Sequence, residues 1–117
     1  MIGYKPHLPT LDAGLIQEII RRVVGAVRPE KIILFGSRAR GDHRPDSDID
    51  LLVIQKSNLP RHRRAVPIYE ALNGLPVDVD LETIVYTPAE VEEWSEVRQA
   101  FVTTALREGK VLYESAA

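Results

Sequence analysis

Apolar residues recur along the first part of the chain with the spacing of a helix. Between Thr10 and Val27 they form one stripe made of Leu11, Leu15, Ile16, Ile19, Ile20, Val23 and Val24. This spacing predicts an amphipathic helix that buries one face. Thr10 is the expected N-cap, and Pro29 follows the expected end of the helix.

Shorter apolar runs predict strands. Lys31–Phe35 is rich in β-branched residues and stops at Gly36, and Asp46–Ile54 is a second run of this kind. Val77–Tyr86 alternates acidic and apolar residues before it turns apolar, which is typical of a strand. Lys110–Glu114 is expected to form a last short extended segment.

Two further helices are expected. Leu59–Leu72 has a partly helical pattern, but Pro67 in its middle favours a short helix. Thr87 and Pro88 form a helix-start signature, with the threonine as cap and the proline at the first helical position. From there the apolar spacing predicts one continuous helix, Pro88–Glu108.

The order of these elements indicates an α+β fold over a single domain, residues 1–117. About ten residues join the first two strands, too few for a parallel crossover helix. These strands are therefore expected to be antiparallel neighbours, or to be offset by a single turn of helix. We expect a small mixed β-sheet with helices packed on one side.

The composition of the chain limits the classes of function that it can have. The chain has 117 residues and a net charge of −2, so any contact with a nucleotide depends on a local site. The absence of cysteine excludes disulfides and cysteine-ligated zinc and favours a cytosolic location. No stretch of sequence is typical of a signal peptide or a membrane span. The basic cluster Arg61–Arg64 lacks interleaved aromatic residues and is interpreted as a solvated helix face, so direct nucleic-acid binding is not expected.

Two carboxylates interrupt the second strand. Asp48 and Asp50 point to the same face, roughly 6.5–7 Å apart along the strand, while Ile49, Leu51 and Val53 point to the core. Paired ionised carboxylates repel each other unless a cation lies between them. Mg²⁺ is the expected occupant, because it binds one or two carboxylates together with substrate phosphates.

The loop before these aspartates has groups that suit phosphate. Gly36 and Ser37 begin a turn that exposes backbone N–H groups and a hydroxyl. Arg38 and Arg40 add two guanidinium groups. A phosphate-binding turn next to a metal-binding pair indicates metal-dependent phosphoryl or nucleotidyl transfer.

A third strand supplies more acids on one face, namely Asp78, Asp80 and Glu82. If this strand lies beside Asp46–Ile54, one of them meets Asp48 and Asp50. Three carboxylates would then hold two metal ions about 3.5–4 Å apart.

The stretch "FGSRARGDHRPDSDIDLLV" resembles the signature of the polymerase-β-like nucleotidyltransferase superfamily. The form "GSRARG" and the small size are similar to its minimal nucleotidyltransferase (MNT) branch, as are, more loosely, "YTPAEVEEW" and "REGKVLYE". The resemblance implies that Gly36 and Ser37 contact a nucleoside triphosphate, and that Asp48 and Asp50 hold magnesium. It also implies a third carboxylate on a later strand that positions the attacking hydroxyl. Asp80 is the first candidate for this ligand, and Glu82 and Asp78 remain open.

Proteins of the MNT branch are commonly antitoxins paired with a helical HEPN ribonuclease toxin, and some transfer AMP from ATP to a tyrosine of that toxin. The resemblance therefore implies a magnesium-dependent adenylyltransferase that acts on a HEPN-type partner. One alternative is a transferase for a small-molecule hydroxyl, as in aminoglycoside nucleotidylation, with a homodimer supplying the acceptor pocket. Another is a catalytically silent nucleotidyltransferase fold that neutralises its partner by contact alone.

Overall fold

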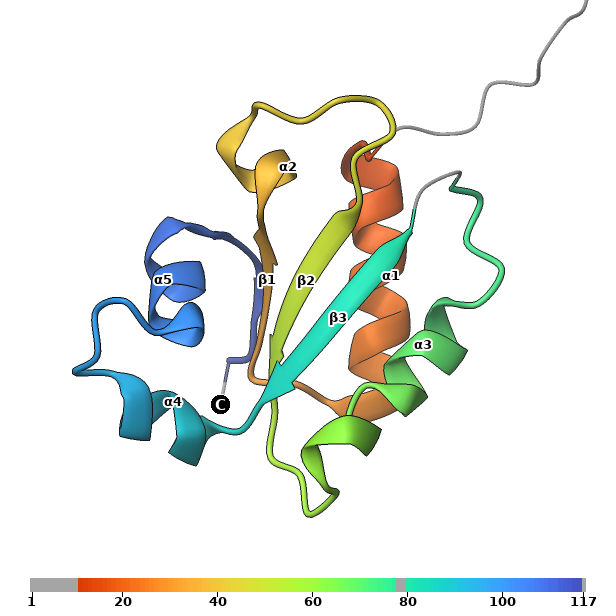
Figure 1. The fold of residues 1–117 in the computed structure, drawn as a ribbon. Coiled ribbons are helices and arrows are strands. Elements are labelled where there is room, and N and C mark those ends of the chain that lie inside the picture. Colours follow the sequence, from red (N-terminus) through yellow and green to blue (C-terminus); the bar gives the residue numbers. More distant parts are fainter. Residues whose placement is uncertain (1–10, 78–79, 117) are drawn as a thin grey trace, which may run out of the picture.

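The computed structural model describes residues 11–77 and 80–116, which form a four-stranded mixed sheet of order β3-β2-β1-β4 (Figure 1). The strands are β1 (Lys31–Phe35), β2 (Ile49–Ile54), β3 (Leu81–Tyr86) and β4 (Lys110–Glu114). Strand β1 is antiparallel to both β2 and β4, whereas β2 and β3 are parallel. The short connection from β1 to β2 contains the one-turn helix α2 (Ser37–Arg40). The predicted α+β class, mixed sheet and antiparallel pairing are confirmed.

Helices cover both faces of the sheet, so the expectation that they pack on one side was wrong. The helices α1 (Ala13–Val27) and α3 (Val66–Leu72) lie on one face, and α4 (Pro88–Trp94) and α5 (Phe101–Glu108) lie on the other (Figure 1). The reason lies in β2, where Leu51 and Val53 belong to the first core cluster and Leu52 and Ile54 to the second. A strand that is apolar on both faces needs cover on both sides.

The helices on the first face begin later than the sequence suggested. Helix α1 starts after Asp12, whose carboxylate accepts a hydrogen bond from the Leu15 N–H at 2.9 Å, whereas Thr10 lies outside the described residues. Helix α3 is short, as expected, and Pro67 lies in its first turn and not in the middle of a longer helix. No helix within the described ranges is both long enough and apolar enough to cross a membrane.

The continuous helix predicted for residues 88–108 is broken in two. Helix α4 ends at Trp94, and α5 starts only at Phe101. The Thr103 hydroxyl donates to the Trp94 carbonyl at 2.7 Å, which satisfies a carbonyl at the end of α4. After the break, α5 buries Val102 and Ala105 against the sheet.

The basic cluster is mostly a solvated face, as predicted, since residues 61–63 are exposed, but Arg64 is partly buried and the cluster also contributes to the fold. Arg61 and Arg64 both pair with Glu90 of α4, at 3.2 and 2.7 Å, and the Arg64 side chain is only 12% exposed. Glu90 also accepts a hydrogen bond from the Thr87 N–H at 2.8 Å, which completes a capping box. Burial raises the pKa of Glu90, but the Thr87 hydrogen bond and the two arginines outweigh it and hold this pKa at about 2.

Candidate active site

Three carboxylates converge at one end of the sheet. Asp48 lies just before β2, Asp50 lies in β2, and Glu82 is the residue paired with Asp50 in the parallel register of β3. One oxygen from each lies within 4.8 Å of the others. Asp48 and Glu82 are exposed and Asp50 is half-buried, so the group is open to a ligand from solvent.

Asp80, the first candidate for the third carboxylate, does not belong to this group. It is exposed and precedes β3, and its backbone carbonyl accepts a hydrogen bond from the Ile49 N–H at 2.9 Å. Strand alternation puts residues 80 and 82 on one face, so only the register between β2 and β3 decides which of them is level with Asp50. That register favours Glu82 as the third carboxylate. Asp78 lies outside the described residues.

Burial and the two neighbouring carboxylates act on Asp50. Partial burial raises the pKa of Asp50, the negative charges of Glu82 and Asp48 raise it further, and only Arg40 acts in the opposite direction. A cation held between the three side chains would remove this repulsion. Because all three donors are hard carboxylate oxygens, the group fits Mg²⁺.

Gly36 brings the turn after β1 close to this group. Its backbone has φ 76° and ψ −157°, a conformation open essentially to glycine alone. A Cβ at this position would overlap an Asp50 carboxylate oxygen and lie 3.3 Å from Asp50 Cγ. Ser37 then begins α2, in which the Ala39 and Arg40 N–H groups both donate to the Gly36 carbonyl at 3.1 Å. The Ser37 and Arg38 N–H groups come before them and have no carbonyl within this turn to bond. The turn is thus placed to present N–H groups beside the carboxylates, as a phosphate site requires.

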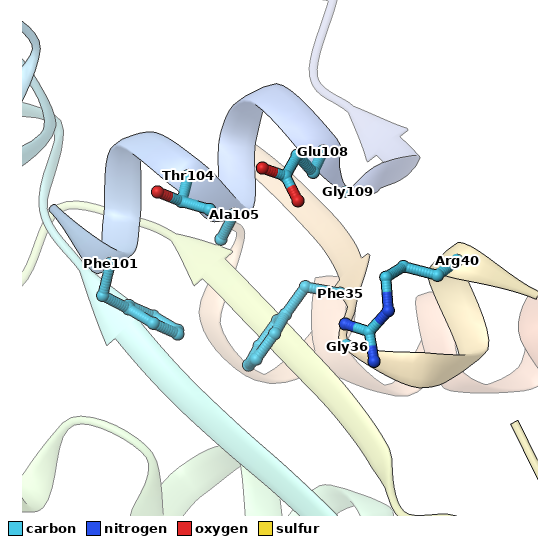
Figure 2. A pocket seen from close by; sticks show the side chains of 8 residues that line it. All are labelled: Phe35, Gly36, Arg40, Phe101, Thr104, Ala105, Glu108 and Gly109. Carbon is cyan, nitrogen blue, oxygen red and sulfur yellow. The ribbon is translucent and has the colours of Figure 1, made fainter. Parts of the chain in front are cut away.

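The two arginines of the turn differ in their surroundings. The Arg38 guanidinium donates to the Ser47 carbonyl at 2.9 and 3.1 Å and to the Pro45 carbonyl at 3.3 Å. It therefore holds the loop that leads into Asp48, and its predicted phosphate contact would require this contact to change. Arg40 is exposed, pairs with Asp42 at 3.2 Å, and lines a pocket next to Gly36 (Figure 2).

That pocket has a volume of about 130 Å³ and lies between the end of β1 and α5 (Figure 2). Its lining is Phe35, Gly36, Arg40, Phe101, Thr104, Ala105, Glu108 and Gly109. Phe35, Phe101 and Glu108 are site candidates that the sequence analysis missed. Phe35 could have been found, because it immediately precedes Gly36. The two α5 residues could not, because they approach the turn only through the unpredicted break between α4 and α5.

Comparisons with known proteins agree with this geometry. A family profile described as "Nucleotidyltransferase domain" matches residues 16–107. A candidate nucleotidyltransferase from Sulfolobus solfataricus has a similar structure, with a TM-score of 0.60 and 23% identity over 86% of this chain and 78% of that one. A toxin–antitoxin complex with AMP-PNP gives a TM-score of 0.55 and 24% identity, over 86% of this chain and 74% of that one.

A mutant of the MntA–HpeT toxin–antitoxin gives a TM-score of 0.53 and 23% identity, over 86% of this chain and 74% of that one. At these identities, the three likenesses establish the fold. A search of curated proteins finds no significant match. Because the family profile covers most of the sequence and the fold agrees, this chain belongs to the nucleotidyltransferase-domain family.

Proposed function

We propose that this protein is a magnesium-dependent nucleotidyltransferase that transfers AMP from ATP to a protein hydroxyl. The observation that carries the proposal is the convergence of Asp48, Asp50 and Glu82 beside the turn at Gly36. A structural role alone does not account for three converging acids, of which Asp50 has its pKa raised by burial first and then by the charges of Glu82 and Asp48.

Each group of the site has a distinct task in this reaction. Backbone N–H groups at Gly36 and Ser37, with the Arg40 guanidinium, bind and orient the triphosphate. Asp48, Asp50 and Glu82 would hold Mg²⁺, which when bound neutralises phosphate charge and makes the α-phosphorus more electrophilic.

The transfer itself is an in-line displacement. The acceptor oxygen forms a bond to the α-phosphorus, the bond from that phosphorus to the bridging oxygen breaks, and pyrophosphate leaves. Glu82, which is exposed, takes the proton of the attacking hydroxyl. Arg40 stabilises the negative charge that develops on the leaving pyrophosphate.

The acceptor in this proposal is a hydroxyl of a HEPN-type helical partner, which this chain would neutralise as its antitoxin. Support comes from the MNT-like sequence signature and from the fold shared with the MntA–HpeT complex and with the toxin–antitoxin bound to AMP-PNP. The site is also open, with Asp48 and Glu82 exposed, so a hydroxyl on a protein surface can reach it.

Calorimetric titration of ATP, with and without Mg²⁺, tests the nucleotide site. We expect magnesium-dependent binding to the wild type, and its loss in the Asp48→Asn/Asp50→Asn variant. Asp46→Asn is the matched control, because it removes a nearby exposed charge outside the carboxylate group. Unchanged binding in the double variant would contradict the proposal.

Transfer is then measured with α-labelled ATP and a HEPN-type helical protein as the acceptor. We expect label on the partner, its loss in Glu82→Gln and its persistence in Asp80→Asn. Loss in Asp80→Asn with activity retained in Glu82→Gln would reverse the assignment of the third carboxylate.

A further inference from the structure

An aromatic cluster continues the sheet face that carries the carboxylates. Phe35 pairs with Asp50 across β1 and β2, and Asp50 pairs with Glu82 across β2 and β3. Residues directly opposite each other on neighbouring strands point to the same face, so these three side chains form one row. The Phe35 ring therefore lies on the same face as the candidate catalytic group.

Helix α5 places a second ring beside Phe35 (Figure 2). The Phe101 ring meets Phe35 edge to face, with centroids 5.2 Å apart and planes at 82°, and it stacks on Tyr86 at 6.3 Å and 28°. Phe101 is nevertheless 41% exposed, so much of its surface is left uncovered by the core. An exposed ring at the mouth of a pocket is available for a ligand.

The size of the pocket restricts what can enter it. Its volume of about 130 Å³ is close to the roughly 150 Å³ of an engineered cavity that takes a benzene-sized ring. It is well below the roughly 300–1,000 Å³ of sites that enclose a whole small-molecule ligand. The pocket can therefore enclose about one aromatic ring, such as the six-membered ring of a purine, while the rest of the ligand lies outside.

The charge and position of the lining residues indicate which ligand the pocket binds. Gly36 and Arg40 line both the pocket and the proposed phosphate site, so a ligand in the pocket continues directly into that site. The rim also carries Glu108, an exposed carboxylate that pairs with Arg107 at 3.1 Å. A carboxylate accepts hydrogen bonds from an amino group and repels a carbonyl oxygen.

We propose that this pocket binds the nucleobase of the triphosphate, with Phe101 as the stacking surface and Glu108 as an acceptor for an exocyclic amino group. The inference rests on the proposed nucleotidyltransferase function and adds the residues that contact the base. Adenine carries such an amino group and uracil does not, so the pocket favours ATP over UTP. Stacking of the base on the Phe101 ring, which any base can make, supplies the remaining affinity.

The test compares ATP with inorganic tripolyphosphate, which lacks the base and the ribose, by calorimetry in the presence of Mg²⁺. We expect Phe101→Ala to weaken ATP binding roughly 5- to 150-fold and to leave tripolyphosphate binding unchanged. Phe101→Tyr keeps the ring and should bind ATP as the wild type does. Trp94→Ala is the matched control, because Trp94 is equally exposed, at 41%, but does not line the pocket.

A second comparison does not depend on the stability of Phe101→Ala. We expect the wild type to bind ATP more tightly than UTP, and Glu108→Gln to reduce this preference. Equal ATP binding by the wild type and Phe101→Ala, or equal binding of ATP and UTP by the wild type, would overturn the base pocket and leave the proposed function intact. Failure of the wild type to bind either ATP or tripolyphosphate would overturn the proposed function and the pocket with it.

Discussion

Replacing Gly36 with alanine tests the link between the turn and the carboxylate group most directly. The backbone of Gly36, with φ 76° and ψ −157°, lies in a region that costs a residue with a Cβ about 1–3 kcal/mol. For a chain of this size, 1 kcal/mol corresponds to roughly 4 °C in melting temperature. We therefore expect Gly36→Ala to lower the melting temperature by about 4–12 °C.

The same substitution should also disturb the site itself. The new Cβ would overlap the Asp50 carboxylate, so that side chain must move away from Asp48 and Glu82. Disturbing groups that orient metal ligands costs roughly 10- to 100-fold in metal affinity, and we expect a loss of this size for magnesium-dependent ATP binding. Calorimetry, at a temperature where the variant is folded, measures it.

The Gly74→Ala variant separates the effect of backbone strain from the effect of overlap with the Asp50 side chain. Gly74 also has a positive φ, of 84°, but a Cβ there would meet nothing within 4 Å. This variant should lose stability, by about 1–2 kcal/mol, and keep its affinity for magnesium and ATP. The reasoning is refuted if Gly36→Ala binds magnesium and ATP as tightly as the wild type, or if Gly74→Ala loses binding to the same extent.

Three further substitutions test the charges and the sheet edge. Asp50→Asn should raise the melting temperature at neutral pH without magnesium, because the raised pKa of Asp50 means that its ionised form destabilises the folded state. Scanning calorimetry should show this gain shrinking as the pH falls through the raised pKa of Asp50 and absent below the ordinary carboxyl pKa, and a lower melting temperature at pH 7 would contradict it. Glu90→Gln should lower the free energy of unfolding by about 1.5–3 kcal/mol at pH 7, through its weakened pair with Arg64. Because the folded-state pKa of Glu90 is about 2, urea titrations should show this difference disappearing between about pH 4.5 and 2, and a constant difference would exclude the ionic explanation. Tyr69→Phe should cost about 0.5–1.5 kcal/mol, because the phenol oxygen accepts the Thr83 N–H at 2.8 Å; unchanged urea unfolding would show that water replaces it.

Local sequence signals predicted most elements of this fold. The apolar runs located the four strands of the described sheet, and the threonine–proline pair at residues 87 and 88 located the start of α4. These signals depend on neighbours along the chain, which the sequence displays directly. The break after Trp94 depends instead on contacts made across that break, such as the hydrogen bond from the Thr103 hydroxyl. The spacing of apolar residues along the chain does not reveal such contacts.

Some parts of the candidate site could likewise be predicted from the sequence, and others could not. Asp48, Asp50 and Gly36 belong to one continuous motif, so their proximity followed from the sequence. The choice between Asp80 and Glu82 needed the register of β3 against β2, and a shift of two residues would have exchanged them without changing which face they occupy. The pocket beside the turn needed the position of α5, which followed from no local pattern.

The placement of Glu82 depends on contacts outside the site, because β3 is an edge strand that pairs only with β2 in the described sheet. Its free side is held by the Tyr69 phenol, which accepts from the Thr83 N–H next to Glu82 and lies 3.4 Å from the Thr83 carbonyl. An edge strand without such a hold exposes unpaired backbone groups and can shift or pair elsewhere. Tyr69 is therefore a positioning residue for the third carboxylate. The Tyr69→Phe variant should therefore weaken magnesium binding more than a variant that loses one hydrogen bond at a surface position far from the site.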